Sequence, residues 1–319
     1  MNLHPQSPTL IVQSDRSKAY LALLLNAVIW GAALPIVKPA LDHISPYQYL
    51  FYRYLIAAPL AAPLLVILAR KHKTTLKKLF GIIGLELLGV TGALSFLYQG
   101  LSRTTSLEAT LIANAAPVFI IIGGILFLKE KEEGHELFGL LLAIAGVTVL
   151  TLEPLTALAN GLHLSLTGNL FVLGHNLFWA AYILLAKRYY KGVSKLLISS
   201  ISLWVGLISF LVLTLLTDST GSAVNLISNI GIHLSLPSVL LAAVYMAVLG
   251  SIVAVPAYIY GNDLIEASEA SLFFYLQPLI TIPLATIWLK ESLTIPMIAA
   301  ALLSTVGVVI AQRRKKPTA

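Results

Sequence analysis

The sequence contains no cysteine, which excludes disulfide bonds and thiolate metal sites. It also carries few charges: Asp, Glu, Lys and Arg make up 11% of its 319 residues, against about a quarter in a typical soluble domain. Hydrophobic residues account for 58% of the chain, and its mean hydropathy is +0.87. A chain with so little polar surface to present to water is predicted to be a membrane protein.

Groups of side chains that carry out catalysis are missing as well. The seven histidines match no metal-ligand spacing, and no glycine-rich loop follows a strand, so no nucleotide-binding segment is predicted. The aspartates are dispersed, at Asp15, Asp42, Asp218 and Asp263. The sequence therefore predicts no enzyme, no cofactor and no metal, and leaves a polytopic membrane enzyme as a remote alternative.

Apolar runs long enough to cross a bilayer recur along the chain. A transmembrane helix needs about 20 mainly apolar residues to cross roughly 30 Å of hydrocarbon. These runs are apolar on nearly all faces, which disagrees with the alternating pattern of barrel strands. We therefore predict an all-α integral membrane protein with ten transmembrane helices, at residues 18–40, 46–69, 79–101, 105–128, 136–152, 167–187, 196–216, 236–260, 266–289 and 293–312.

Charge placement predicts the orientation. Residues 1–17 are polar and lack the features of a secretory signal, so they are interpreted as a mobile cytoplasmic tail, and 313–319 as a basic cytoplasmic tail. Basic residues gather between the predicted helices rather than on one face of a domain, which argues against nucleic acid binding despite a net charge of +7. The positive-inside rule makes both termini cytoplasmic, because most basic residues then lie inside: Arg16, Lys18, Arg70, Lys71, Lys73, Lys77, Lys78, Lys129, Lys131, Lys187, Arg188, Lys191, Lys195 and Arg313 to Lys316.

The sequence also repeats itself. Residues 108–130 and 269–291 both open with Glu-Ala, carry proline at the tenth place and close with Leu-Lys-Glu. A shift of 161 residues superimposes Pro117 on Pro278, and a shift of 149 superimposes Trp30 on Trp179. We therefore predict two five-helix repeats, at 18–152 and 167–312, joined by a linker at 153–166.

The repeat has a mechanical consequence. Because five is odd, the second repeat enters the membrane from the opposite side, so a pseudo-two-fold axis in the membrane plane relates the two. Inverted repeats of this kind are typical of transporters, in which a central site opens alternately to each side.

The order and duplication of several short motifs carry a family resemblance. They are Asn26, Trp30 and Gly31 in the first helix, Arg53 in the second, a proline and a final Leu-Lys-Glu in the fourth and ninth, and Gly-Val at 146–147 and 307–308. From about residue 18 to 312 the chain resembles the EamA type of the drug/metabolite transporter superfamily. The resemblance implies ten helices around a central cavity, a bacterial or archaeal cytoplasmic (inner) membrane, and export of amino acids or other small metabolites. Ala180 and Ser202, the shifted counterparts of Gly31 and Arg53, depart from the motif.

A stripe of polar and aromatic residues is predicted at mid-depth. At 1.5 Å per residue, Trp30 and Trp179 each lie about 18 Å from the entrance of their helix, away from the interfacial belt that tryptophan prefers. We interpret the stripe as the lining of a substrate site, with ordinary helix packing as the alternative. The candidate substrate-binding residues are Asn26, Trp30, Tyr98, Asn114, His175, Trp179, Tyr182, Tyr258, Tyr275 and Gln277.

Glu86 is the sharpest single candidate. It lies about 10 Å inside the third helix, where an unpaired carboxylate costs about 2.5–3.5 kcal/mol. Its shifted counterpart is Ala247, so the fold itself does not require an acid there. We hypothesise that Glu86 lines the cytoplasmic half of the pathway and binds a cationic group or a coupling proton; pairing with a neighbouring helix is the alternative.

Other unusual residues are given structural roles. Pro117 and Pro278 are predicted to kink the fourth and ninth helices and to act as hinges. Arg53 lies among tyrosines, and we interpret it as structural support; binding of a substrate carboxylate is the alternative. Glu108 and Glu269 are interpreted as helix caps.

Small residues recur at helical spacing in the fifth and tenth helices. They are Gly139 and Ala143 in the former and Ala300 and Ser304 in the latter. This spacing predicts close helix contact, within the fold or between protomers of a homo-oligomer.

Taken with these residues, the resemblance predicts a secondary transporter that exports amino acids or similar amphiphilic metabolites by alternating access, without ATP. Its predicted partners are a small-molecule solute and the lipid bilayer. A flippase for a lipid-linked sugar or a nucleotide-sugar carrier is the alternative. A nucleotide-sugar carrier should place several Lys or Arg along its cavity to meet phosphates, whereas the basic residues here lie mostly in the predicted inner loops.

Overall fold

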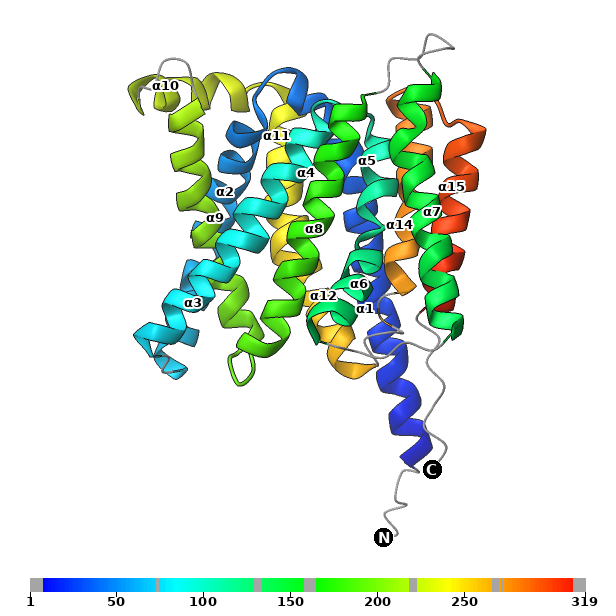
Figure 1. Cartoon of the computed structure of the whole chain (residues 1–319). Coiled ribbons are helices and arrows are strands. Elements are labelled where there is room, and N and C mark those ends of the chain that lie inside the picture. Colours follow the sequence, from blue (N-terminus) through cyan, green and yellow to red (C-terminus); the bar gives the residue numbers. More distant parts are fainter. Residues whose placement is uncertain are drawn as a thin grey trace.

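The computed structural model describes residues 8–72, 75–128, 134–157, 165–217, 223–265, 270 and 272–311, and it consists of helices joined by short turns (Figure 1). The first half contains α1 (Pro8–Val37), η1 (Lys38–Asp42), α2 (Pro46–Lys71), α3 (Leu76–Glu86), η2 (Leu87–Gly92), α4 (Ala93–Leu101), α5 (Ser106–Ala113), α6 (Ala116–Leu128) and α7 (Gly134–Ala157). The second half contains α8 (Leu166–Tyr189), α9 (Lys195–Thr217), α10 (Ala223–Leu234), α11 (Pro237–Val244), η4 (Tyr245–Val253), α12 (Ala254–Leu264), η5 (Leu272–Leu276), α14 (Gln277–Pro283), η6 (Leu284–Trp288) and α15 (Ile295–Ala311).

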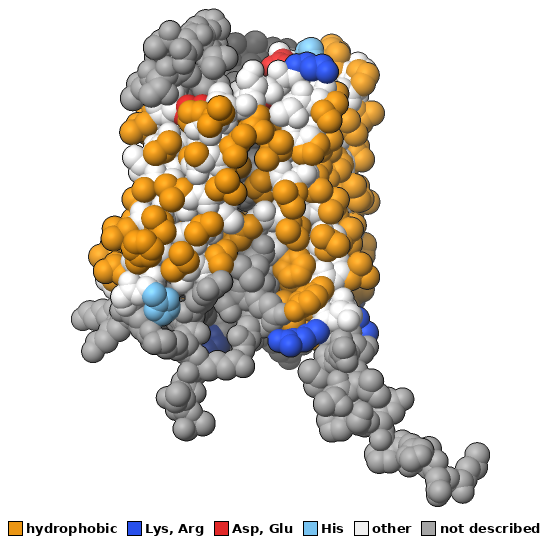
Figure 2. Space-filling model, turned by 90° about the vertical axis from the view of Figure 1, so that its right-hand side faces the viewer, with side chains coloured by type: hydrophobic (Ala, Val, Ile, Leu, Met, Phe, Trp, Pro, Cys, Tyr) orange, Lys and Arg blue, Asp and Glu red, His pale blue; other side chains and the backbone are white. Residues whose placement is uncertain are grey.

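The helices have the length and surface of membrane spans. Within the described residues, seven stretches are long and apolar enough to cross a bilayer, and three shorter apolar helices, Leu137–Glu153, Phe273–Trp288 and Ile295–Ile310, overlap the remaining predicted segments. Figure 2 shows hydrophobic side chains across the middle of one face, with charged side chains and histidine towards its two ends. The prediction of an all-helical membrane protein is confirmed.

Two helical segments differ from the prediction. α1 begins at Pro8, inside the stretch interpreted as a mobile tail, and its lower part extends below the other helices (Figure 1). α10 was not predicted at all, and it lies across the upper end, where the Tyr52 hydroxyl contacts His233 Nδ1 at 2.8 Å (Figure 1). An amphipathic helix that does not span the membrane gives no long apolar run, so the hydropathy of the sequence did not reveal it.

Several spans are interrupted at mid-depth. η2 and η4 are π-helical segments inside the third and eighth spans, at places that a shift of 161 residues brings into overlap. The fourth span breaks at Asn114 and Ala115, between α5 and α6. α6 begins at Ala116, and a shift of 161 residues superimposes Ala116 on Gln277, where η5 gives way to α14 in the ninth span. π-Helical segments shift backbone carbonyls out of their usual pairing and are frequent at functional sites.

The first helix of each half packs in the other half. α8 packs against α3, η2, α4, α5 and α6, and we call this set the α8 bundle. α1 packs against α11, η4, α12, η5, α14 and η6, and we call this set the α1 bundle. α2 packs against α9, and α7 against α15. The contacts named here have counterparts when the two halves are exchanged, whereas the contacts of α7 with α8 and of α5 with α1 have no counterpart of similar extent among the described residues.

Close backbone contacts follow the same exchange. A Cβ added to Gly100 would lie 2.8 Å from the Gly168 carbonyl oxygen, and one added to Gly261 would lie 3.1 Å from that of Ala19. These two pairs are related by the 161- and 149-residue shifts. Between α7 and α15, a Cβ on Gly146 would lie 2.6 Å from the Ser304 nitrogen. The small residues of these two helices therefore serve packing within the chain.

Candidate functional site

The first aromatic cluster surrounds Trp30 of α1. Its ring stacks on Phe274 at a centroid distance of 5.9 Å and lies 6.1 Å from the ring of Tyr258. Trp30 Nε1 donates to the Gly250 carbonyl of η4 at 3.2 Å. The indole therefore faces the second half of the chain rather than lipid, and the π-helical segment supplies its hydrogen-bond acceptor.

The second cluster lies along α8. His175 stacks on Trp179 at 6.2 Å, and Trp179 lies 5.3 Å from Tyr182. The Tyr182 ring packs against Gly89 of η2, where an added Cβ would come within 2.4 Å of it. Gly89 is the counterpart of Gly250, so the two clusters contact equivalent points of the two π-helical segments.

Each cluster contains a side chain that bonds to an equivalent backbone carbonyl. Asn26 Nδ2 donates to the Ala254 carbonyl at 3.0 Å, and His175 Nδ1 lies 2.9 Å from the Ala93 carbonyl oxygen. Because a carbonyl only accepts, His175 carries its proton on Nδ1. Asn26 and His175 are counterparts, as are Ala254 and Ala93, and each carbonyl directly follows a π-helical segment. Different side chains thus perform the same pairing in both halves.

The two breaks in the fourth and ninth spans hold unpaired polar atoms. Asn114 Nδ2 and the Tyr275 hydroxyl are both buried and lack a hydrogen-bond partner in the described part of the chain. A shift of 161 residues superimposes Asn114 on Tyr275. Buried polar groups are normally paired, so two unpaired atoms at equivalent places indicate a position where a ligand or water binds.

Glu86 is paired with hydroxyl groups from neighbouring helices. Its side chain is 1% exposed and accepts hydrogen bonds from Tyr182 at 3.1 Å, Tyr190 at 2.6 Å and Ser202 at 2.5 Å. Among the described residues, no Lys or Arg nitrogen lies within ion-pair distance of it. The Glu86 carboxyl group is therefore hydrogen-bonded to side chains outside its own helix, and these donors are neutral hydroxyl groups rather than a positive charge.

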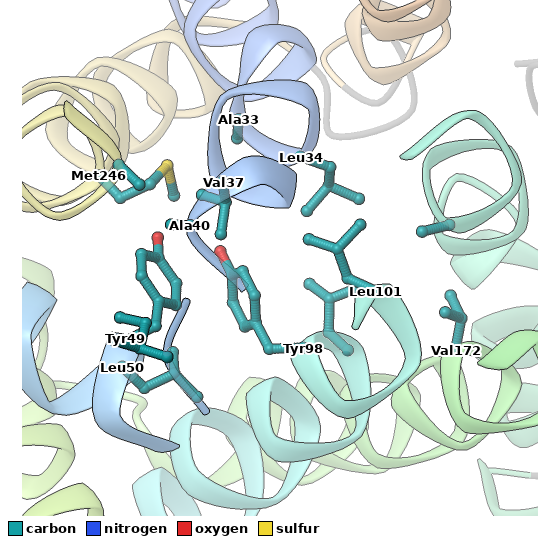
Figure 3. Close-up of a cluster of buried hydrophobic side chains, with 14 of the residues drawn as sticks. Ala33, Leu34, Val37, Ala40, Tyr49, Leu50, Tyr98, Leu101, Val172 and Met246 are labelled. Atoms are coloured by element: carbon teal, nitrogen blue, oxygen red, sulfur yellow. The ribbon is translucent and has the colours of Figure 1, made fainter. Parts of the chain in front are cut away.

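The remaining candidates lie apart from the two clusters. Tyr98 is 1% exposed and packs against Tyr49 at 5.0 Å, in the core shown in Figure 3. Gln277 begins α14, where its carbonyl oxygen would lie 2.8 Å from a Cβ on Gly31. Pro117 and Pro278 lie in the first turns of α6 and α14, directly after the breaks, where a missing N–H is tolerated. Their role as hinges stays a prediction.

Sequence reasoning missed several partners. The stacking of Phe274 on Trp30 was not predicted. Tyr190 had no role, and Ser202 was seen only as the counterpart of Arg53, yet both donate to Glu86. The one signal in the sequence is the spacing of Tyr190, which caps α8 eight residues after Tyr182 and so lies near the same face of that helix. Backbone acceptors such as Gly250 O carry no signal in the sequence.

At the upper end, two charged side chains, Lys38 of η1 and Glu291 after η6, contact the chain around the end of α4 and the start of α5. Lys38 Nζ donates to the carbonyls of Leu101 and Thr104, both at 2.7 Å. Glu291 accepts from the backbone N–H groups of Ser106 at 2.7 Å and Leu107 at 2.9 Å, at the start of α5. A carboxylate at a helix N-terminus is favourably placed to accept from unpaired N–H groups. α5 also packs against α1 and α14.

The helices, their exchange between halves and the buried polar clusters define an integral membrane protein of the transporter class. Residues 17–152 and 166–312 both match the model of the EamA-like transporter family. The chain therefore belongs to the EamA-like transporter family, as the motifs predicted, and the prediction of a transporter rather than an enzyme is confirmed. The two matched segments nearly coincide with the ranges predicted for the repeats.

Relatives of known organism span almost the whole chain. An uncharacterized transporter, YyaM, of Bacillus subtilis (strain 168) is 27% identical over 82% of this chain and 83% of its own length. A probable amino-acid metabolite efflux pump of Escherichia coli (strain K12) is 28% identical over 93% of this chain and 95% of its own length. A protein of known crystal structure, 16% identical, superimposes with a TM-score of 0.60 over 92% of this chain and 96% of its own, which shows a shared fold.

Proposed function

We propose that this transporter exports amino acids or similar small amphiphilic metabolites by alternating access, from a bacterial or archaeal cytoplasm through the inner membrane. Both termini lie on the cytoplasmic side in this proposal: α1 begins and α15 ends at the same, lower end of the molecule (Figure 1). The basic residues of the described inner-side segments, among them Arg70, Lys71, Lys77 and Lys78, favour the same orientation.

The two unpaired polar atoms at the helix breaks carry the substrate-site proposal. Asn114 and Tyr275 occupy equivalent places in the fourth and ninth spans, and packing alone does not explain why both leave a buried polar atom unpaired. A solute with polar groups would supply the missing partners, and the rings of Trp30 and Trp179 would contact its apolar part. Binding near the midplane at broken helices is typical of inverted-repeat transporters.

The contacts between the bundles support alternating access. At the outer end, Lys38 directly follows α1 and Glu291 follows η6, and both bond to the chain around the end of α4 and the start of α5 in the α8 bundle. α5, the outer half of the fourth span, packs against α1 and α14, whereas the main contacts of α6, its inner half, are with α8 and α7. This arrangement supports a conformation closed towards the outside, in which a two-fold exchange of contacts would open the outer side and close the inner one.

Exchange by the purified protein in liposomes tests this function. Vesicles loaded with one unlabelled amino acid are given the same amino acid in labelled form, for each of the twenty in turn. We expect counterflow of at least one amino acid above the level of protein-free vesicles, without ATP. The absence of counterflow for every amino acid, together with scrambling of a fluorescent lipid by the same vesicles, would replace the exporter by the flippase alternative.

A further inference from the structure

Arg53 is a buried cation for which the described part of the chain offers no anion. Its side chain is 8% exposed, and the groups around it are neutral: Nε and Nη2 donate to Ser251 Oγ at 3.3 and 3.1 Å, and the hydroxyl groups of Tyr49, Tyr54 and Tyr98 interact with the guanidinium. The guanidinium also lies 5.2 Å from the centre of the Tyr54 ring. A guanidinium has five N–H donors and is costly to hold within a membrane without an opposite charge.

A second unpaired group lies beside it. Tyr49, one helical turn before Arg53 on the same face of α2, is fully buried, and its hydroxyl has no hydrogen-bond partner among the described residues. Figure 3 shows the Tyr49 and Tyr98 hydroxyls pointing towards α1, near Val37, Ala40 and Met246. A cation and an unused hydroxyl on one face form a site complementary to an anion.

This site adjoins the Trp30 cluster. Trp30 bonds the Gly250 carbonyl, and Arg53 bonds the side chain of the next residue, Ser251, in the same π-helical segment. Trp30 and Arg53 therefore bond to adjacent residues, and a solute that stacks on the indole would lie close to the guanidinium. The counterpart of Arg53 is Ser202, which donates to Glu86, so the related place in the other half has the opposite charge.

We infer that Arg53 and the Tyr49 hydroxyl bind the carboxylate of the transported solute. The inference rests on the proposed export of small metabolites and narrows the class of solute to carboxylates. Because Glu86 lies at the related place in the other half, amino acids and other zwitterions are favoured. Guanidinium binds carboxylate through two parallel hydrogen bonds, which combine geometric selectivity with strength.

The test compares each exchanged amino acid with its primary amide, which keeps the ammonium group and loses the carboxylate. We expect the wild type to prefer the acid by roughly tenfold or more in competition for counterflow, because a site built for charged hydrogen bonds rejects an analogue that lacks them. Arg53→Gln should reduce this preference to about twofold or less, and Arg53→Lys should keep part of it, since a point charge remains without the planar fork.

Two further variants keep the test decisive. Tyr49→Phe removes a hydroxyl that has no partner, so the fold should persist while the preference falls by roughly threefold. Arg103→Gln, at an exposed arginine bonded to Gln99 at the outer end, is the matched control and should leave the preference unchanged.

The outcomes separate the inference from the function. Equal exchange of acid and amide by the wild type overturns the carboxylate site but leaves the exporter. The carboxylate site is also overturned if both Tyr49→Phe and Arg53→Gln keep the preference of the wild type for the acid over the amide. If Arg53→Gln does not fold, an unchanged preference in Tyr49→Phe alone overturns it. A wild type that exchanges no amino acid overturns both the carboxylate site and the exporter.

Discussion

Glu86→Gln should remove the response of counterflow to an inward proton gradient and slow exchange by roughly 10- to 100-fold. The carboxylate accepts from three hydroxyl groups, and hydrogen bonds to a charged group are worth about 1.5–3 kcal/mol each. Glutamine keeps the shape of the side chain but has no charge and no exchangeable acid. A cationic group of the solute or a coupling proton would lose its binding partner at this position. Counterflow measured in liposomes with and without a pH step gives both quantities.

Glu108→Gln is the matched control. Glu108 is also fully buried, but it accepts from Thr105 N–H at 3.3 Å in a capping box and from Asn169 Nδ2 at 2.8 Å, at the outer end of α5. We expect this variant to lower the melting temperature while the response to pH persists. A Glu86→Gln protein that folds and exchanges solute like the wild type across pH would exclude the coupling role and leave Glu86 as a structural acceptor.

Trp30→Ala should raise the solute concentration for half-maximal exchange by roughly tenfold or more. The substitution removes a ring stacked on Phe274, a contact worth about 0.5–1.5 kcal/mol beyond buried area, and it leaves the Gly250 carbonyl without its indole donor. An unpaired carbonyl in this setting costs about 1–3 kcal/mol. Trp30→Phe retains the stacking and should recover most of the apparent affinity. Titration of counterflow against solute concentration measures the effect.

Trp288→Ala serves as the comparison, because Trp288 lies at the outer end of the ninth span and is 47% exposed. Its loss should leave the half-maximal concentration within about twofold of the wild type. Equal effects of Trp30→Ala and Trp288→Ala would indicate a general loss of stability and would argue against a binding role for the Trp30 ring.

The membrane spans and the equivalence of the two halves were both predicted from regularities along the chain. Long apolar runs predict spans, and the shifts that superimpose Trp30 on Trp179 and Pro117 on Pro278 predict which helices are equivalent. The observed contacts of Gly100 and Gly261 obey the same shifts. Hydropathy does not reveal α10, because an amphipathic helix that lies across the end of a bundle has no long apolar run.

The geometry of the site was less accessible, because much of it is made by backbone. The carbonyls of Gly250, Ala254 and Ala93 accept from Trp30, Asn26 and His175, and they are available because η2 and η4 are π-helical. Nothing in the side-chain pattern marks a π-helical segment, whose register depends on packing in three dimensions. The unpaired Tyr49 hydroxyl is invisible in the sequence for the same reason: its environment comes from α4 and η4 as well as from α2.

Distances between spin labels at the two ends of the molecule test the alternating exchange of the bundles most directly, and the absence of native cysteine allows labels to be placed without background. One pair is at the outer end: Asp42→Cys in η1, which follows α1, and Arg103→Cys between α4 and α5. The other pair is at the inner end: Ser17→Cys in α1 and Leu76→Cys in α3. On addition of an exchanged solute, we expect the distance distribution of one pair to lengthen while that of the other shortens. Distributions that stay fixed, or that lengthen or shorten together, would contradict alternating access through two exchanged halves.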